Sequence, residues 1–117
     1  MKIAYKVWLD NHGKAFGNGP YELLQRVEET KSLHQAANRM GMAYSKAWRL
    51  ILTIEKRVGF ALIERKVGGH SGGGSWLTPQ GKELMSRYCL FQKEVKTSLE
   101  KIYRTYFSCT RKMRLSK

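Results

Sequence analysis

Acidic residues are few in this sequence. Only 9 Asp and Glu accompany 22 Lys and Arg among 117 residues, so the formal net charge is +13. The excess is concentrated in two places: residues 31–66 hold eight basic and two acidic residues, and residues 101–117 hold six basic residues and no acidic one. Clustered positive charge of this kind is typical of proteins that bind the phosphates of nucleic acids.

Cysteine is also rare, with Cys89 and Cys109 as the two examples. On a single helix these residues would lie roughly 30 Å apart, which is too far for a disulfide. No apolar run approaches the ~20 residues of a membrane span, and the N-terminus lacks the apolar core of a signal peptide. These absences predict free thiols and a cytoplasmic, nucleoid-associated protein that does not enter a membrane.

No arrangement of residues points to catalysis. The glycine-rich run of residues 69–74 has the first spacing of a nucleotide-hydrolase phosphate loop, but Ser75 stands where that motif needs a lysine. The three histidines, His12, His34 and His70, are scattered and have no cysteine or carboxylate at ligand spacing. We therefore expect no enzyme activity, no metal, no cofactor and no small-molecule site. The length predicts one domain, too short for an additional ligand-binding domain.

The centre of the sequence, residues 32–59, has the pattern of a helix-turn-helix. Ser32 is a favourable N-cap for a first helix, and Gly41 can adopt the left-handed conformation that ends it. Two helices cross closely only where side chains are small, and three alanines meet this need: Ala36, Ala37 and Ala47. An ordinary helical hairpin in a core would explain these features equally well.

The outer face of the second helix favours DNA recognition over that alternative. Apolar residues at helical spacing predict a buried stripe of Ala47, Leu50, Ile51, Ile54 and Val58. The other residues form a polar, basic face that starts at the helix N-terminus, where DNA-reading helices present side chains to bases. This face comprises Tyr44, Ser45, Lys46, Arg49, Thr53, Lys56 and Arg57. Trp48 could pack in the core or lie against the sugar backbone, and we expect partial burial with an exposed edge.

Further elements are predicted around this unit. Apolar residues alternate from Ile3 to Leu9 and precede turn residues, which predicts an N-terminal β-hairpin over residues 2–17. Pro20 predicts the first turn of a supporting helix that runs to about Thr30. Residues 60–77 predict a two-stranded wing, with its first strand over residues 59–67 and its second over residues 75–77.

The loop between the wing strands contains five glycines in residues 68–74. Glycine lets backbone N–H groups approach an anion closely, and Arg65 and Lys66 stand beside the loop. Composition alone leaves two interpretations open, a wing tip that meets DNA and a loose hairpin tip.

Thr78 and Pro79 predict the N-cap and first turn of a last helix over residues 79–107. Its apolar residues recur every three or four positions, over a length greater than a small winged domain can cover. The stripe comprises Leu84, Tyr88, Phe91, Val95, Leu99, Ile102 and Tyr106. We expect it to pack on a second copy of itself; a helix that folds back over its own domain would hide only the first turns. Residues 108–117 predict a basic, disordered tail.

From Gly19 to about Tyr88 the sequence resembles the N-terminal winged helix-turn-helix domain of the molybdate-responsive regulator (ModE) family, itself similar to the LysR-type DNA-binding domain. The matching segments are Ser32-Leu33 with Ala36-Ala37, Gly41-Met42-Ala43-Tyr44-Ser45-Lys46-Ala47-Trp48, Leu62-Ile63-Glu64-Arg65, residues 68–74, and Leu77-Thr78-Pro79-Gln80-Gly81. The resemblance implies that the wing contacts DNA and that the long helix forms a dimer. The best-known members bind molybdate in a C-terminal domain. This sequence ends soon after the long helix, so we expect a stand-alone DNA-binding protein without molybdate sensing.

The predicted fold is mainly α with small β elements (α+β): a winged helix-turn-helix domain over residues 1–78, with the helix-turn-helix at 32–58, followed by the dimerisation helix. We assign DNA contacts to the recognition-helix residues Ala43, Tyr44, Ser45, Lys46, Trp48 and Arg49. Backbone and wing contacts are assigned to Ser32, Arg65, Lys66, His70 and Ser71. Dimer contacts are assigned to Tyr88, Phe91, Val95, Leu99, Ile102 and Tyr106.

The function expected from these assignments is sequence-specific binding of double-stranded DNA by a homodimer that regulates transcription. Its recognition helices would enter successive major grooves about 34 Å apart, so the site would be an inverted repeat. Two other classes stay open, a nonspecific nucleoid-type architectural protein and a winged-helix protein-interaction module.

Overall fold

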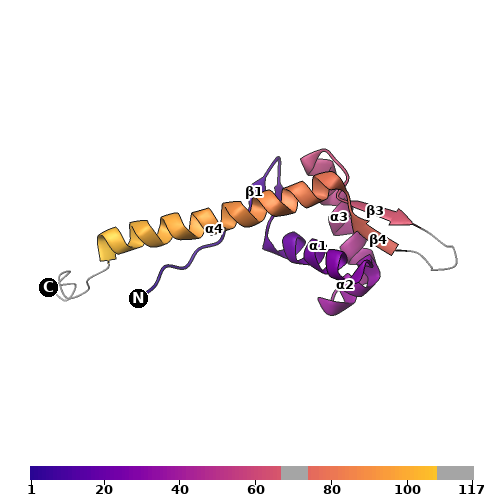
Figure 1. The fold of residues 1–117 in the computed structure, drawn as a ribbon, viewed down its shortest axis with the longest axis horizontal. Helices are drawn as coiled ribbons and strands as arrows, with labels where there is room; N and C mark the ends of the chain where they lie inside the picture. The colour runs from indigo at the N-terminus through magenta and orange to yellow at the C-terminus, as the bar shows by residue number, and fades with distance from the viewer. Residues whose placement is uncertain (67–73, 108–117) are drawn as a thin grey trace. The chain divides into compact units, whose positions relative to one another are not determined.

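The computed structural model describes residues 1–66 and 74–107. In chain order its elements are β1 (Leu9–Asp10), β2 (Lys14–Phe16), α1 (Asn18–Thr30), α2 (Leu33–Arg39), α3 (Tyr44–Val58), β3 (Ile63–Lys66), β4 (Gly74–Leu77) and α4 (Pro79–Phe107). Helices dominate, and the strands form two small antiparallel hairpins, β1–β2 and β3–β4 (Figure 1). The predicted α+β fold class is confirmed. The chain divides into two units: residues 7–86, and residues 1–6 together with the chain from Arg87 onward.

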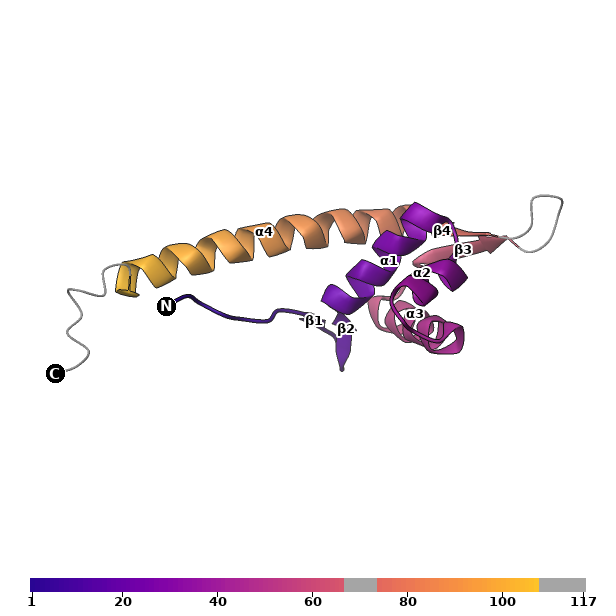
Figure 2. The same cartoon turned by 90° about the horizontal axis from the view of Figure 1, so that it is seen from below.

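The core of the residue 7–86 unit is formed by α1, α2 and α3, which pack together beside the wing hairpin (Figure 2). Its large, fully buried side chains are Phe16, Leu23, Leu24, Val27, Leu33, Ile51, Ile54 and Leu62. Burial of each such side chain stabilises the fold by about 1.5–3 kcal/mol. Ala36, Ala37 and Ala47 are also completely buried, as expected where helices approach closely. Leu50 and Val58, which were predicted to be buried, are half-buried at the edge of this core.

The helix ends follow the predicted capping residues. The Ser32 hydroxyl accepts a hydrogen bond from the Gln35 backbone N–H at 3.1 Å and caps α2. Gly41 has a φ of +64° in the turn between α2 and α3, a conformation that glycine adopts without steric cost. Thr78 caps α4, because its hydroxyl oxygen accepts a hydrogen bond from the Gly81 N–H at 2.9 Å.

The predicted N-terminal hairpin over residues 2–17 is wrong in its first half. The first strand begins only at Leu9, and residues 1–8 form no strand. The returning strand, Lys14–Phe16, is three residues long and pairs only with Leu9 and Asp10. The alternating residues before Leu9 therefore have no strand to pair with, although their period is that of a strand.

The first wing strand is also shorter than predicted and begins at Ile63. Gly59, with a φ of +89°, instead ends α3. The Glu55 carboxylate at the end of α3 accepts hydrogen bonds from the backbone N–H groups of Leu62 at 2.7 Å and Ile63 at 3.3 Å. The Thr78 hydroxyl donates to the Ala61 carbonyl at 2.6 Å. These contacts attach the base of the wing to α3 and to the start of α4.

Helix α4 is 29 residues long, as predicted. In the unit formed by residues 1–6 and the chain from Arg87 onward, the N-terminal segment runs beside the helix (Figure 1). Tyr88 is only 2% exposed, and burial raises the pKa of its phenol. Gln92 donates a hydrogen bond from its side-chain nitrogen to the Tyr88 hydroxyl at 2.6 Å. Within the described residues, no helix is long and apolar enough to span a bilayer.

Candidate nucleic-acid interface

The N-terminal half of α3 carries the residues predicted to contact DNA. Ala43 is the extended residue that precedes the helix. Ser45, Lys46 and Arg49 are exposed. Tyr44 is half-buried, and its ring lies 5.3 Å from the ring of His34 on α2. Ser45, Lys46 and Arg49 are therefore accessible on α3, the second helix of the helix-turn-helix, whose place in the fold Figure 2 shows.

The cations of this surface have no acidic partners in the part of the chain that the structure describes. Three ion pairs there join α1 carboxylates to nearby cations, namely Glu22 with Arg26, Glu28 with Lys31 and Glu29 with Arg39. Lys46, Arg49 and Lys56 of α3 form none of them. The cations beside α1 are therefore compensated by its carboxylates, whereas those of α3 are left to attract an anion.

Leu52 belongs to the same face and was missed by the sequence interpretation. It lies three residues after Arg49 and four before Lys56, which places all three on one side of the helix. Its side chain is 47% exposed. Helical spacing from Arg49 could have identified it, but the sequence interpretation assigned Leu52 to neither face of the helix.

Arg57 is bonded to the fold itself, although it was predicted to belong to the open polar face. It is half-buried and donates a hydrogen bond from Nη1 to the Lys14 carbonyl at 2.6 Å. The Arg57 carbonyl in turn accepts a hydrogen bond from the Asn11 side chain at 2.8 Å. Arg57 therefore joins the C-terminal end of α3 to the β1–β2 hairpin.

Trp48 is half-buried, as expected. The guanidinium of Arg65, on wing strand β3, lies over the Trp48 indole with its Cζ atom 4.8 Å from the ring centroid. This distance is within the range of a cation–π contact. One residue of the recognition helix and one of the wing thus meet directly.

The remaining wing residues have distinct surroundings. Glu64 accepts a hydrogen bond from the Trp76 indole N–H at 3.0 Å across the β3–β4 pair. Lys66 is exposed. The Ser75 N–H donates to the Lys31 carbonyl at 2.9 Å, which fixes β4 to the turn between α1 and α2. His70 and Ser71, also predicted to contact DNA, lie outside the described residues.

Ser32 is half-buried, and its hydroxyl is engaged in capping α2. A phosphate at this position would therefore meet the helix N-terminus as much as the serine itself.

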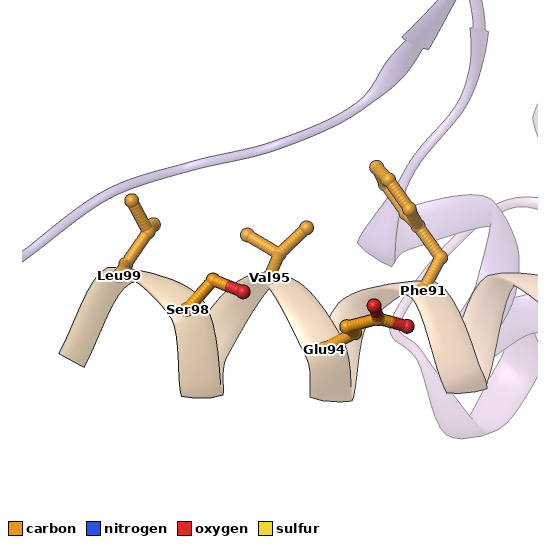
Figure 3. A pocket seen from close by; sticks show the side chains of 5 residues that line it. All are labelled: Phe91, Glu94, Val95, Ser98 and Leu99. Atoms are coloured by element: carbon orange, nitrogen blue, oxygen red, sulfur yellow. The ribbon is translucent and has the colours of Figure 1, made fainter. Parts of the chain in front are cut away.

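A second surface lies on α4. Phe91, Val95 and Leu99 point to the same side of the helix, with Glu94 and Ser98 along its flank (Figure 3). Together they line an open groove of about 440 Å³. Ile102 and Tyr106 continue this face and are 55% and 70% exposed. Tyr88, predicted to belong to the same stripe, is instead buried within the single chain.

Among residues 1–66 and 74–107, no three His, Cys, Asp or Glu side chains lie close enough together to hold a metal ion. The site therefore consists of a basic helix face and a cationic wing strand fixed to the same small core.

Comparison with known proteins identifies related sequences. Residues 21–82 match the model for bacterial regulatory helix-turn-helix proteins of the lysR family. The chain is 39% identical over 66 residues to the molybdenum transport protein ModE of Herbaspirillum seropedicae. This match covers 56% of this chain and 24% of that protein. It is 35% identical over 68 residues to the DNA-binding transcriptional dual regulator ModE of Escherichia coli K12. That match covers 58% of this chain and 26% of the other protein. The chain thus spans about a quarter of the length of these relatives.

Solved structures share the fold. The CbnR_DBD-DNA complex superposes with a TM-score of 0.55 at 18% identity, covering 74% of this chain and 94% of that one. The BenM_DBD/benA site 1 DNA complex gives a TM-score of 0.54 at 21% identity, covering 78% of this chain and 97% of that one. At such low identity the likeness establishes the architecture, a winged helix-turn-helix followed by a long helix.

Proposed function

Because the chain belongs to the lysR family of bacterial regulatory helix-turn-helix proteins, we propose that it binds double-stranded DNA sequence-specifically and regulates transcription. The observation that carries the proposal is the set of exposed α3 cations, Lys46, Arg49 and Lys56, which pair with no carboxylate among the described residues. Surface cations left without acidic partners are available to phosphates and base edges.

The proposed contacts divide into base reading and backbone binding. Arg49 is the base-reading candidate, since the arginine fork pairs with the O6 and N7 atoms of guanine. Leu52 extends the same face with an apolar side chain suited to the methyl group of thymine. Lys46 and Lys66 are suited to phosphates, which fix the register of a protein on the duplex.

The proposed assembly is a homodimer formed through α4. The support is the apolar face of Phe91, Val95, Leu99, Ile102 and Tyr106, on which Phe91, Ile102 and Tyr106 are exposed and Val95 and Leu99 are half-buried. Two copies paired by a twofold axis would present two recognition helices, and the DNA site would be an inverted repeat.

Selection of bound duplexes from random DNA tests the proposal. We expect one enriched motif with twofold symmetry and half-sites separated by one helical turn or a multiple of it. An unsymmetrical motif would exclude an inverted-repeat site. The absence of any enriched motif would exclude sequence-specific recognition.

Arg49→Ala tests the assignment of base reading. The loss of a guanine contact should cost about 1–3 kcal/mol on the selected site and relax the preference at one position of each half-site. The measurement is a binding isotherm on the selected duplex and on single-base variants of it. A uniform loss on all duplexes would show that Arg49 contacts only phosphate.

Two other functions would give different results in DNA-binding experiments. An architectural protein would cover genomic DNA evenly in a footprint, without discrete peaks. A protein-interaction module would bind DNA weakly, with little dependence on salt. A protein that contacts six to ten phosphates should instead lose roughly three to five powers of ten in affinity between 50 and 200 mM salt.

A further inference from the structure

The contact between Arg65 and Trp48 joins the two parts of the interface. Trp48 lies on α3, one residue before Arg49, and Arg65 lies on β3 in the wing. The Arg65 Cζ atom is 4.8 Å from the centroid of the Trp48 ring. A guanidinium that lies over an aromatic ring uses its flat face for the contact and keeps its N–H edges free for other partners.

Strand geometry determines which wing residue meets the tryptophan. Successive side chains of a strand point to opposite faces. Ile63 is buried, so Arg65 shares the face of β3 that is turned to the core, whereas Glu64 and Lys66 share the other face. Arg65 is the next inward-facing residue beyond the core, and Trp48 is the side chain that it meets.

The neighbouring carboxylate is held away from this cation. Glu64 accepts a hydrogen bond from the Trp76 indole on the opposite face of the hairpin, at 3.0 Å. In the described part of the chain, no ion pair involves Arg65. The charge of Arg65 is therefore not balanced by a carboxylate, and contact with an uncharged ring fixes the position of its guanidinium.

We propose that Trp48 is a positioning residue that holds the Arg65 guanidinium beside the recognition helix, so that Arg65 binds a DNA phosphate in register with the base contacts of α3. This inference rests on the proposed DNA-binding function. It assigns Trp48 an indirect role, through Arg65, instead of a separate contact with the sugar backbone.

The test is a double-mutant cycle on the full chain, with the duplex obtained by selection and with affinity measured across a salt series. Each phosphate contact contributes about 0.9 to the slope of log affinity against log salt. Arg65→Ala should reduce the magnitude of this slope by about 0.9, the contribution of one phosphate contact. Trp48→Leu should lower it by a similar amount although no charge is removed, and the double variant should show no further loss. Additive effects of the two substitutions, or an unchanged slope in Trp48→Leu, would overturn the inference.

Lys66 supplies the matched control. It is the next residue of the same strand and points to the other face, so the effects of Lys66→Ala and Trp48→Leu on affinity should be additive. Coupling of Trp48 to Lys66 as strong as its coupling to Arg65 would indicate a general disturbance of the wing and would contradict a specific role.

Arg65→Lys makes the test independent of whether Trp48→Leu folds. This variant keeps the charge but loses the planar group, so affinity should fall roughly two- to fivefold, the ratio expected for the loss of an exposed cation–π contact. Wild-type affinity in Arg65→Lys would overturn the inference. If the wild-type protein binds no duplex in a salt-dependent manner, the proposed function itself fails; if it binds while the cycle is additive, only the role of Trp48 fails.

Discussion

At the scale of single residues, Leu52 is an apolar side chain on a face otherwise built for polar contacts. It is 47% exposed and lies between Arg49 and Lys56 on that face. If it contacts the methyl group of a thymine in the major groove, Leu52→Ala should weaken binding about fourfold, the effect of roughly 0.8 kcal/mol for one methyl-sized apolar contact. Binding isotherms on the selected duplex measure this loss.

Replacement of thymine by uracil in the duplex provides the control, because it removes only the methyl group. Uracil at the contacted position should weaken the wild-type protein by the same factor and leave Leu52→Ala unaffected. Equal sensitivity of both proteins to uracil at every thymine would exclude the contact.

Gly81 is a residue where the fold leaves no space for a side chain. A Cβ atom there would lie 2.6 Å from the Leu62 backbone carbonyl oxygen. Gly81→Ala should therefore lower the free energy of unfolding by about 1–3 kcal/mol through overpacking, despite the better helix propensity of alanine. Urea denaturation measures the change. Gln80→Ala, an exposed substitution one residue earlier in the same helical turn, should leave the stability nearly unchanged.

Residue-level prediction from the sequence succeeded where local chemistry decides the role. Ser32, Gly41 and Thr78 act as predicted because capping and left-handed turns depend on the residue itself and its nearest neighbours. Arg57 was misassigned because polarity was taken as a guide to exposure, and Leu52 was assigned to neither face. Arg57 has its partner on the β1–β2 hairpin, which periodicity on α3 does not reveal. The exposure of Leu52, by contrast, agrees with its helical spacing from Arg49.

At the scale of elements, the β1–β2 hairpin supports the end of the recognition helix. Arg57 on α3 donates to the Lys14 carbonyl, and Asn11 donates to the Arg57 carbonyl. Arg57→Ala should remove the first of these bonds and lower the free energy of unfolding by about 1 kcal/mol. Since the Arg57 guanidinium is engaged with the backbone of the hairpin, the salt dependence of DNA binding should stay unchanged.

Lys56→Ala is the matched control for Arg57→Ala, because the two neighbours carry the same charge in different surroundings. Lys56 is exposed and has no acidic partner among the described residues. We expect unchanged stability and a reduced salt slope for Lys56→Ala, the reverse of the result for Arg57→Ala. Similar effects of the two substitutions on both measurements would contradict the separation of their roles.

Helices were more predictable than strands in this chain. The boundaries of α3 and α4 follow from spacing and caps within each segment. A strand needs a partner, so the alternation before Leu9 was insufficient to make one, and the first wing strand begins only where it can pair with β4. The meeting of Arg65 with Trp48 was beyond prediction for the same reason, since it depends on how the wing packs beside α3.

At the scale of the whole molecule, positive charge is distributed unevenly along the chain. Residues 1–30 contain four basic and four acidic residues, whereas residues 31–66 contain eight basic and two acidic residues. The acidic side chains of α1 are used in ion pairs with Arg26, Lys31 and Arg39. Long-range attraction to DNA therefore favours approach by α3 and the wing, and its strength should decline as salt increases.

Assembly is the property of the whole molecule that the apolar face of α4 should control. Glutamates placed at Val95 and Ile102 would bury uncompensated charge in a helix pair, which is strongly unfavourable. Val95→Glu with Ile102→Glu should therefore give the mass of one chain in light scattering at concentrations where the wild-type protein has the mass of two. DNA binding should lose its dependence on two half-sites, because each chain would then bind alone.

The control for assembly adds the same charge to the other side of α4. Leu90 is 62% exposed and Thr97 is exposed, and both lie away from the face of Val95 and Ile102 by helical spacing. Leu90→Glu with Thr97→Glu should keep the wild-type mass and the preference for paired half-sites. A dimer that persists in Val95→Glu with Ile102→Glu would show that the copies associate through another surface. The exposed apolar groove of α4 would then need a different partner, since an apolar face of this length rarely stays in water.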